Sequence, residues 1–238
     1  MTKQRARSTR VLFIVWRVAT LVLFVLAAGL LTAYARGYRI NPARFSFEAT
    51  GAISLTGEVR DVQVMVGSEL VGKKLPLYIA GLVPNRAYNV AITKTGFQTW
   101  QKHVPIEPEK IATYGPILLF RDQYSLSPVE PPDKVGLCSR NERSDTARLE
   151  INGGELRTTL DLITRVSVPI ADACWFNDQY HIAYIADNKL HVVEVDGGND
   201  VIIAQSTENL TAVAVAPDNS EIYVKGPAET WRKISLED

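Results

Sequence analysis

The sequence predicts a mostly β protein with a single N-terminal transmembrane helix, followed by a small antiparallel β-sandwich and then by further antiparallel β-sheets. Three observations predict this organisation. One long apolar run lies near the N-terminus, at residues 11–34. After residue 50, short alternating segments recur about every 10 residues between Gly and Pro turns, as strands do. Residues 148–238 repeat a strand–turn–strand plan at a spacing of about 40 residues.

The charge of the chain is balanced overall but unevenly distributed. The 238 residues include 26 Lys and Arg and 26 Asp and Glu. Residues 1–44 hold eight of the basic side chains and no acidic one, which leaves 18 basic and 26 acidic side chains and a net charge of −8 for the remainder. An acidic body argues against nucleic acid as its partner. The basic start suggests a tail that stays on the cytoplasmic side of a membrane.

The apolar run has the length and composition of a membrane span. Apolar side chains fall on all faces of a helix there, and a helix of about 20 such residues crosses a bilayer. We predict a signal anchor over residues 11–35 after a basic cytoplasmic tail at residues 1–10, with the lipid bilayer as its partner. Aromatic rings and snorkelling arginines settle at the headgroups. Three side chains are expected at this interface: Trp16, Arg17 and Tyr34.

Basic flanks predict the orientation of this helix. Counting Arg17, five basic residues lie on its N-terminal side and three lie close to its C-terminal side. This bias places the N-terminus in the cytoplasm and the body outside, in a single-pass protein of the cell membrane. Ala33-Tyr34-Ala35 also has the form of a signal-peptide cleavage site, so cleavage after Ala35 stays open. The run exceeds the roughly 7–15 residues of a signal-peptide core, which favours the uncleaved anchor.

Residues 51–120 are predicted to form the small antiparallel β-sandwich, after a connector at residues 36–50. Apolar and polar side chains alternate over residues 88–93, as in a half-buried strand. Pro84-Asn85 and Thr95-Gly96 bound this stretch as turns. Strands are expected at residues 51–55, 61–66, 75–82, 88–93, 97–106 and 111–120.

Several short motifs in residues 47–120 together suggest a known module. They are Gly51-Ala52-Ile53, Val62-Gln63-Val64, the loop at residues 72–76, Gly81-Leu82-Val83-Pro84, Tyr88-Asn89-Val90 and Lys94-Thr95-Gly96-Phe97-Gln98-Thr99-Trp100. The last is similar to the Lys-x-Gly-Tyr-x-x-Trp motif of the PEGA domain family of bacterial envelope proteins. The tetrad that names this family is replaced by Glu58-Val59-Arg60-Asp61, which implies a differently shaped turn. The resemblance implies a non-catalytic β module.

Two aromatic residues in the last motif have two interpretations. Phe97 and Trp100 could offer a ligand-stacking platform for a sugar, since aromatic faces bind such rings through apolar contact. They could instead pack into the core of the sandwich, which is the usual place of large rings beside a β-turn with apolar neighbours. The core interpretation is favoured.

The remaining chain is predicted to be a linker and a second β region. Residues 121–147 are expected to form a Pro-rich linker and a polar loop, with three prolines at residues 127–135. In residues 148–238, Asn152-Gly153-Gly154 predicts a hairpin turn. Strands are expected at residues 173–176, 181–186, 190–195 and 201–205, and residues 210–226 repeat the plan.

Two units of about 40 residues share this order of elements. Ala216-Pro217-Asp218-Asn219-Ser220 is similar to the Ser-Pro-Asp-Gly turn of propeller blades, so the region resembles part of a β-propeller of the WD-repeat or TolB type. A closed propeller needs about 4–8 blades, so a truncated propeller and an open sheet both stay open. Either leaves sheet edges unpaired, which predicts self-association or pairing with a strand of a partner.

No catalytic, cofactor-binding or metal-binding residues are predicted. The sequence has no G-x-S-x-G, H-E-x-x-H, P-loop or G-x-G-x-x-G motif. Other polar residues are interpreted as ordinary strand or turn residues: His103, His181, His191, Glu107, Glu109, Asp196, Asn199 and Asp200. Cys138 and Cys174 match no metal-binding spacing, and whether they pair stays open.

These observations favour a membrane-anchored extracytoplasmic protein of the bacterial envelope that binds or scaffolds and is not an enzyme. Its expected partner is another envelope protein or a cell-wall glycan. An alternative is a regulatory or sensory subunit whose propeller-like region binds a protein or a small ligand. A cell-wall hydrolase is disfavoured, because no nucleophile–base pair is recognisable in the sequence.

Overall fold

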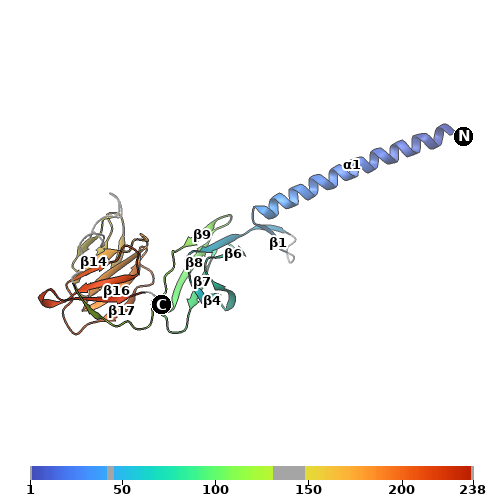
Figure 1. Cartoon of the computed structure of the whole chain (residues 1–238). Coiled ribbons are helices and arrows are strands. Elements are labelled where there is room, and N and C mark those ends of the chain that lie inside the picture. The colour runs from blue at the N-terminus through green and yellow to red at the C-terminus, as the bar shows by residue number, and fades with distance from the viewer. Residues whose placement is uncertain (1, 42–45, 131–147, 237–238) are drawn as a thin grey trace. The chain divides into compact units, whose positions relative to one another are not determined.

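The chain is mostly β, with one N-terminal apolar helix and several antiparallel sheets (Figure 1), which confirms the predicted fold class. The computed structural model describes residues 2–41, 46–130 and 148–236. These divide into two compact units. The first unit comprises Met1–Ser54, Tyr78–Ala87 and Pro105–Ala112, and the second comprises Leu55–Leu77, Tyr88–Val104 and Thr113–Asp238. The predicted domain boundaries remain predictions.

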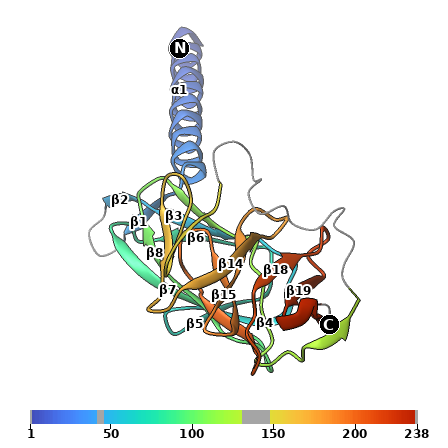
Figure 2. The same cartoon turned by 90° about the vertical axis from the view of Figure 1, so that its left-hand side faces the viewer.

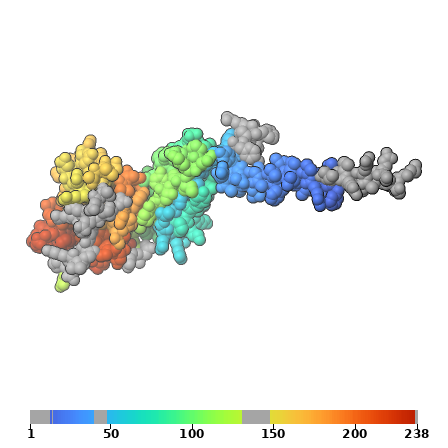
Figure 3. Space-filling model, turned by 90° about the horizontal axis from the view of Figure 1, so that it is seen from above, coloured from blue at the N-terminus to red at the C-terminus, as the bar shows by residue number. Residues whose placement is uncertain are grey.

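Helix α1 spans Thr2–Ala35 and contains the apolar segment Val15–Ala35, which is long and apolar enough to cross a membrane. None of this segment is buried against the rest of the protein (Figure 3). The hydroxyls of Thr20 and Thr32 donate to carbonyls one turn earlier, both at 2.8 Å, so they add no unpaired polar group to the apolar surface. The helix ends at Ala35, and Gly37 shortly after it has a left-handed φ of +88°, which suits a residue that follows a helix C-terminus.

The first unit continues with a short hairpin. Strand β1 (Tyr38–Asn41) pairs antiparallel with β2 (Ser46–Ala49). The connector predicted at residues 36–50 is therefore not irregular, and residues 42–45 lie outside the described part. Strands β3 (Gly51–Leu55), β6 (Leu77–Leu82) and β9 (Ile111–Tyr114) form a sheet in the order β6-β3-β9.

A four-stranded sheet carries the motif-rich part of the first β region. Its order is β5-β4-β7-β8, with β4 at Arg60–Val66, β5 at Glu69–Lys74, β7 at Arg86–Thr93 and β8 at Trp100–Ile106. The predicted alternation is confirmed, because Val90 and Ile92 are buried while their neighbours are not. The predicted turns hold left-handed residues, Asn85 at φ +59° and Gly96 at φ +80°. Edge strand β5 was not predicted, because Glu69, Lys73 and Lys74 break the apolar pattern.

The second β region contains three sheets. Strands β11 (Glu150–Asn152), β12 (Glu155–Arg157) and β13 (Leu162–Arg165) form the first, around the predicted turn at Gly153. The second holds β14 (Ile170–Trp175), β15 (His181–Ala186), β16 (Lys189–Glu194) and β17 (Val201–Gln205) in that order. Strands β15 and β17 have the predicted bounds, and the other two differ by one to three residues at an end.

The third sheet corrects the predicted linker. It contains β18 (Ala212–Val215), β19 (Glu221–Lys225) and β20 (Trp231–Ser235), with a 3-10 turn at Pro227–Glu229. Its fourth strand is β10 (Ser127–Val129), which pairs antiparallel with β20. These three residues were expected to be linker because Pro128 interrupts the apolar pattern. Proline lacks a donor but is tolerated on an edge strand, which is where β10 lies.

The β14–β15 and β18–β19 turns, which join strands labelled in Figure 2, have the same backbone hydrogen-bond pattern, while the predicted repeat stays a prediction. The two turns cover residues 176–181 and 216–221. In each, the backbone N–H of the first residue donates to the carbonyl of the last residue, and the backbone N–H of the fourth residue donates to the carbonyl of the first. The fourth residues, Gln179 and Asn219, are both left-handed, at φ +58° and +61°. The amide oxygen of Asn219 accepts the backbone N–H of Asn177 at 2.7 Å, so one turn supports the other.

The central sheet is covered on both faces, and every residue of β15 is therefore buried. On one face, Ala183 and Ile185 pack with Val213, Ile222 and residues from the third sheet. On the other face, Ile182 and Tyr184 join a cluster with residues of the β11-β12-β13 sheet. Cys174 is buried in the first cluster, and Cys138 lies outside the described residues. This stacking gives the second β region a buried core on both faces of its central sheet.

Candidate functional site

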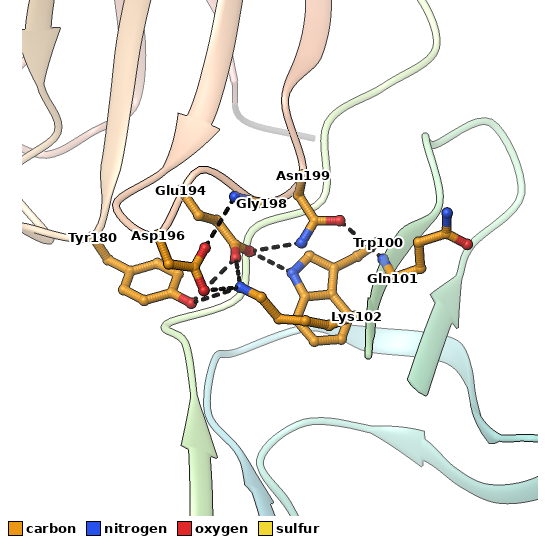
Figure 4. Close-up of polar contacts among 8 residues, drawn as sticks. All are labelled: Trp100, Gln101, Lys102, Tyr180, Glu194, Asp196, Gly198 and Asn199. Carbon is orange, nitrogen blue, oxygen red and sulfur yellow. Dashed lines mark hydrogen bonds and ion pairs between the residues drawn. The ribbon is translucent and has the colours of Figure 1, made fainter. Parts of the chain in front are cut away.

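The most connected polar group in the described residues is centred on Glu194 and is called the Glu194 cluster here (Figure 4). Its members are Trp100, Lys102, Tyr180, Glu194, Asp196 and Asn199. Two of them lie on β8, in the motif-rich first β region, and the other four lie at one end of the β14-β15-β16-β17 sheet. All six belong to the second compact unit.

Backbone geometry in the β16–β17 turn creates the acidic side of the cluster. Gly197 has a φ of +79°, and its N–H donates to the carbonyl of Glu194 at 2.8 Å. A Cβ at Gly197 would lie 2.2 Å from the carbonyl oxygen of Ile163, so only glycine fits this turn. The next N–H, of Gly198, donates to the Asp196 carboxylate at 3.0 Å and fixes its direction. The two glycines therefore aim Glu194 and Asp196 toward β8.

Glu194 is buried, with 1% of its side chain exposed, and both carboxylate oxygens are occupied. Oε1 accepts the indole N–H of Trp100 at 2.5 Å and the amide N–H of Asn199 at 3.1 Å. Oε2 accepts the hydroxyl of Tyr180 at 3.2 Å and pairs with the ammonium of Lys102. A buried carboxylate is tolerated when charge and hydrogen bonds compensate its lost hydration, and four donors do so here.

Lys102 provides the positive charge of the cluster. Its Nζ also lies 2.6 Å from the Asp196 carboxylate, and only 12% of the side chain is exposed. Burial acts to lower the pKa of Lys102, but hydrogen bonds and charge from Asp196 and Glu194 outweigh it and raise that pKa above its ordinary value. Burial and the nearby Glu194 also raise the pKa of Tyr180. Both groups therefore keep their protons as hydrogen-bond donors at neutral pH.

Neighbouring contacts extend the link between the two β regions. The backbone N–H of Gln101 donates to Oδ1 of Asn199 at 2.9 Å. The side-chain amide of Gln98 donates to the carbonyl of Ile202 at 2.9 Å. The segment that resembles the PEGA motif therefore docks on the second β region through side-chain and backbone bonds.

A second polar group adjoins the cluster at the β14–β15 turn. Nδ1 of His181 lies 2.6 Å from Oδ2 of Asp178, and the rings of Phe120 and Phe176 pack edge-on around the imidazole. Burial acts to raise the pKa of Asp178, but bonds from His181 and two backbone N–H groups lower it overall. The described residues contain no group of three or more His, Cys, Asp or Glu suited to a metal ion.

The two residues considered as a stacking platform differ in burial. Trp100 is 3% exposed and lies in the interior, as the favoured core interpretation expects, while ligand stacking stays a prediction. The indole N–H is directed into the second β region, where Glu194 accepts it. Phe97 is half-buried, with Nζ of Lys94 at 4.4 Å and Cζ of Arg121 at 5.8 Å from its ring centre.

The predicted membrane-interface residues lie along α1 and are exposed. Trp16 and Tyr34 are 73% and 62% exposed, at opposite ends of the apolar segment. The guanidinium of Arg17 lies 4.9 Å from the ring centre of Phe13. This arrangement has the spacing that interface anchors need, while their contact with a membrane stays a prediction.

Sequence reasoning missed Glu194 as a key residue. A single acidic side chain at the end of the apolar segment Leu190–Glu194 resembles an ordinary strand end. The detectable signal was the run Asp196-Gly197-Gly198 directly after it, which predicts a tight turn that brings backbone close to another element. Nothing in the sequence shows that this other element is β8.

The hydrogen bonds and ion pairs of the Glu194 cluster connect β8 to the β14-β15-β16-β17 sheet. The hollow lined by Trp100, His181, Glu194 and Asn199 has a volume of about 10 Å³, close to the space of one water molecule. All buried side-chain nitrogen and oxygen atoms in the described residues have hydrogen-bond partners. The Glu194 carboxylate is therefore committed to four protein donors and not to a ligand.

Comparisons with known proteins assign no family to the chain. No known family and no curated protein matches it. Among solved structures it is similar to the C-terminal WD40 domain of Sif2, at 11% identity and a TM-score of 0.33, over 64% of this chain and 43% of that one. The chain thus spans less than half of that structure. The resemblance of residues 47–120 to the PEGA domain stays a prediction.

Proposed function

We propose that the protein is a membrane-anchored binding or scaffolding protein of the bacterial cell envelope, with its body outside the cytoplasm and without catalytic activity. The observation that carries this proposal is the exposed apolar segment Val15–Ala35, which continues directly into a body of packed β-sheets. Such an exposed apolar surface is costly in water and favourable in a bilayer.

The orientation follows from charge. The basic residues before the apolar segment outnumber those just after it, and this bias retains the N-terminus in the cytoplasm. Residues 45–238 carry a net charge of −8, which keeps an exported body soluble.

A binding role is supported by exposed apolar side chains on the β11-β12-β13 sheet and on the β12–β13 connection. Ile151, Leu160 and Leu162 are 40%, 79% and 42% exposed, although they lie next to a well-packed core. Strand β11 is also an edge of its sheet and is exposed at every position. Within the described residues β11 pairs only with β12, and apolar side chains beside such an edge suit a partner protein that adds a strand or covers the face.

The proposed partner is therefore another envelope protein, with cell-wall glycan as the other ligand to test. The full chain, carrying a photo-cross-linking amino acid at Leu160 or, as a matched control, at exposed Asn209, is irradiated in intact cells. We expect one discrete adduct from position 160 that is absent at position 209 and is lost in a chain that also carries Ile151→Ser and Leu162→Ser.

The same purified chain is then incubated with insoluble wall material. Equal adducts at both positions would contradict a specific protein partner at this surface. No adduct at position 160, together with sedimentation of the chain on the wall material, would favour glycan as the ligand instead. Release of soluble wall fragments by the purified chain would instead show a hydrolase and overturn the non-catalytic assignment.

A further inference from the structure

A groove of about 450 Å³ lies where α1 meets the strands of the first compact unit. The helix contributes Tyr34, Ala35 and Arg36 to its wall, and Arg39 follows them on β1. The body contributes Tyr78, Lys110 and Ile111, among others. All of these residues belong to the first compact unit, so the groove is a feature of that unit alone.

The groove is cationic. Its lining includes three basic side chains, Arg36, Arg39 and Lys110, and one acidic side chain, Glu109, which accepts the hydroxyl of Tyr38 at 2.6 Å. Within the described residues, the exposed guanidinium of Arg36 has no hydrogen bond and no ion pair. An unpaired guanidinium matches the bidentate geometry of a phosphate group.

Arg39 is held in place beside Arg36 by the end of the helix. Its Cζ lies 4.0 Å from the ring centre of Tyr34, and one nitrogen donates to the carbonyls of Tyr34 and Tyr38 at 3.3 Å. The remaining donors of this guanidinium stay available to a ligand. The two arginines therefore present a pre-arranged pair of cations at the C-terminal end of α1.

A second, apolar hollow continues from the same place along the helix. It is lined by Val25, Leu26, Gly29, Leu30, Thr32 and Ala33, and ends at Arg36 and Tyr38. Gly29 leaves open space on this side of the helix, because a Cβ there would meet no atom within 4 Å. A cationic groove that adjoins an apolar hollow matches an amphiphile with an anionic head.

We propose that this surface binds an anionic phospholipid, with its phosphate at Arg36 and Arg39 and an acyl chain along the Gly29 side of α1. This inference rests on the proposed membrane anchorage. Arg36 directly follows the 21-residue apolar segment, so an inserted helix would hold it at the depth of the headgroups. Free phosphate would use the cationic groove but not the apolar hollow, which favours the lipid.

The test uses the full chain in nanodiscs and in mild detergent. Native mass spectrometry counts the phospholipids that remain bound after reconstitution in equal amounts of phosphatidylglycerol and phosphatidylcholine. We expect the wild-type chain to retain the anionic lipid in at least roughly fivefold preference, the scale of about 1 kcal/mol per basic residue near a membrane surface. Arg36→Gln with Arg39→Gln should abolish the preference.

The matched control is Lys73→Gln with Lys74→Gln, which removes the same charge from exposed positions on β5 and should leave the preference unchanged. Equal retention of both lipids by the wild-type chain, or an unchanged preference in the arginine variant, would overturn the lipid site. Displacement of the lipid by millimolar glycerol phosphate would also overturn it, in favour of a soluble phosphate ligand.

The membrane anchorage fails by a different measurement. Release of the full chain from vesicles by alkaline carbonate would contradict the insertion of α1 and with it the proposed function. A chain that resists carbonate but shows no lipid preference would leave the anchorage intact and exclude only the lipid site.

Discussion

The indole nitrogen of Trp100 lies 2.5 Å from Oε1 of Glu194, although 94 positions separate the two residues in the chain. Both side chains are buried, so neither can turn to water when the other is removed. A lost partner therefore leaves a buried polar or charged group with an unfilled hydrogen-bonding position, which costs more than the hydrogen bond itself contributes.

The first prediction separates the two roles of Trp100. Trp100→Ala should lower the free energy of unfolding by about 3–5 kcal/mol, as large-to-small core changes do. Trp100→Phe keeps most of the ring but removes the donor to Glu194, and should cost about 1–3 kcal/mol. Urea unfolding of a body without α1 measures both. Native stability of Trp100→Ala, with a loss of glycan binding, would instead support the stacking interpretation.

The second prediction concerns the ion pair of Lys102 and Glu194. Lys102→Met or Glu194→Gln alone should lower the free energy of unfolding by about 3–5 kcal/mol, because each leaves a buried group without its partner. The double variant should cost clearly less than the sum of the two single variants. The control is Lys189→Met, which breaks a more exposed pair with Asp187 and should cost about 0–1 kcal/mol. Strict additivity would contradict the coupling.

The third prediction concerns acid stability. The pKa of Asp178 is lower in the folded protein than the value of about 3.9 expected for the unfolded chain. The unfolded chain therefore binds the proton at a higher pH, so this stabilisation is complete above about pH 3.9 and is lost as the pH falls through the folded pKa. Asp178→Asn should flatten the pH dependence of unfolding below about pH 5. An Asp178→Asn variant with the wild-type pH dependence would contradict this assignment.

The fourth prediction concerns topology. Protease added to spheroplasts should remove the body and leave a membrane-bound N-terminal fragment, because the basic flank of α1 holds that end in the cytoplasm. An epitope fused before Thr2 should be protected, and an epitope after Asp238 should be lost. A protected C-terminal epitope in sealed spheroplasts would reverse the orientation.

The fifth prediction concerns the edge strand β11. A chain of residues 37–238 should show an average mass by light scattering that rises with concentration, because β11 presents an exposed edge beside apolar side chains. Ile151→Lys places a charge on that edge and should reduce the association. A monomer at every concentration, with slow amide exchange along β11, would show that the edge is already covered.

Local patterns predicted most of the strands. Alternation located β4 and β7, because burial of one face selects every second residue, and the turn residues Asn85 and Gly96 marked the two ends of β7. Strand β10 was missed because its partner is distant in the chain and Pro128 is unfavourable in most strands. The Glu194 cluster was missed for the same reason: its members come from two distant segments that become neighbours only after folding. The resemblance of Lys94–Trp100 to a known motif drew attention to Trp100. It did not show that Trp100 contacts Glu194.

The pairing of β10 with β20 has a consequence for the order of events during synthesis. Strand β10 leaves the ribosome before its partner Trp231–Ser235, which emerges only after strands β11 to β19. Until then, β10 has no partner strand, and an unpaired strand of this kind is exposed to competing chains. Such a late, long-range contact slows folding, since a large loop must close before the contact contributes any stability. A chain cut short by even a few residues before Trp231 would therefore leave both β10 and β19 open, and we expect the quality-control proteases of the cell to remove it.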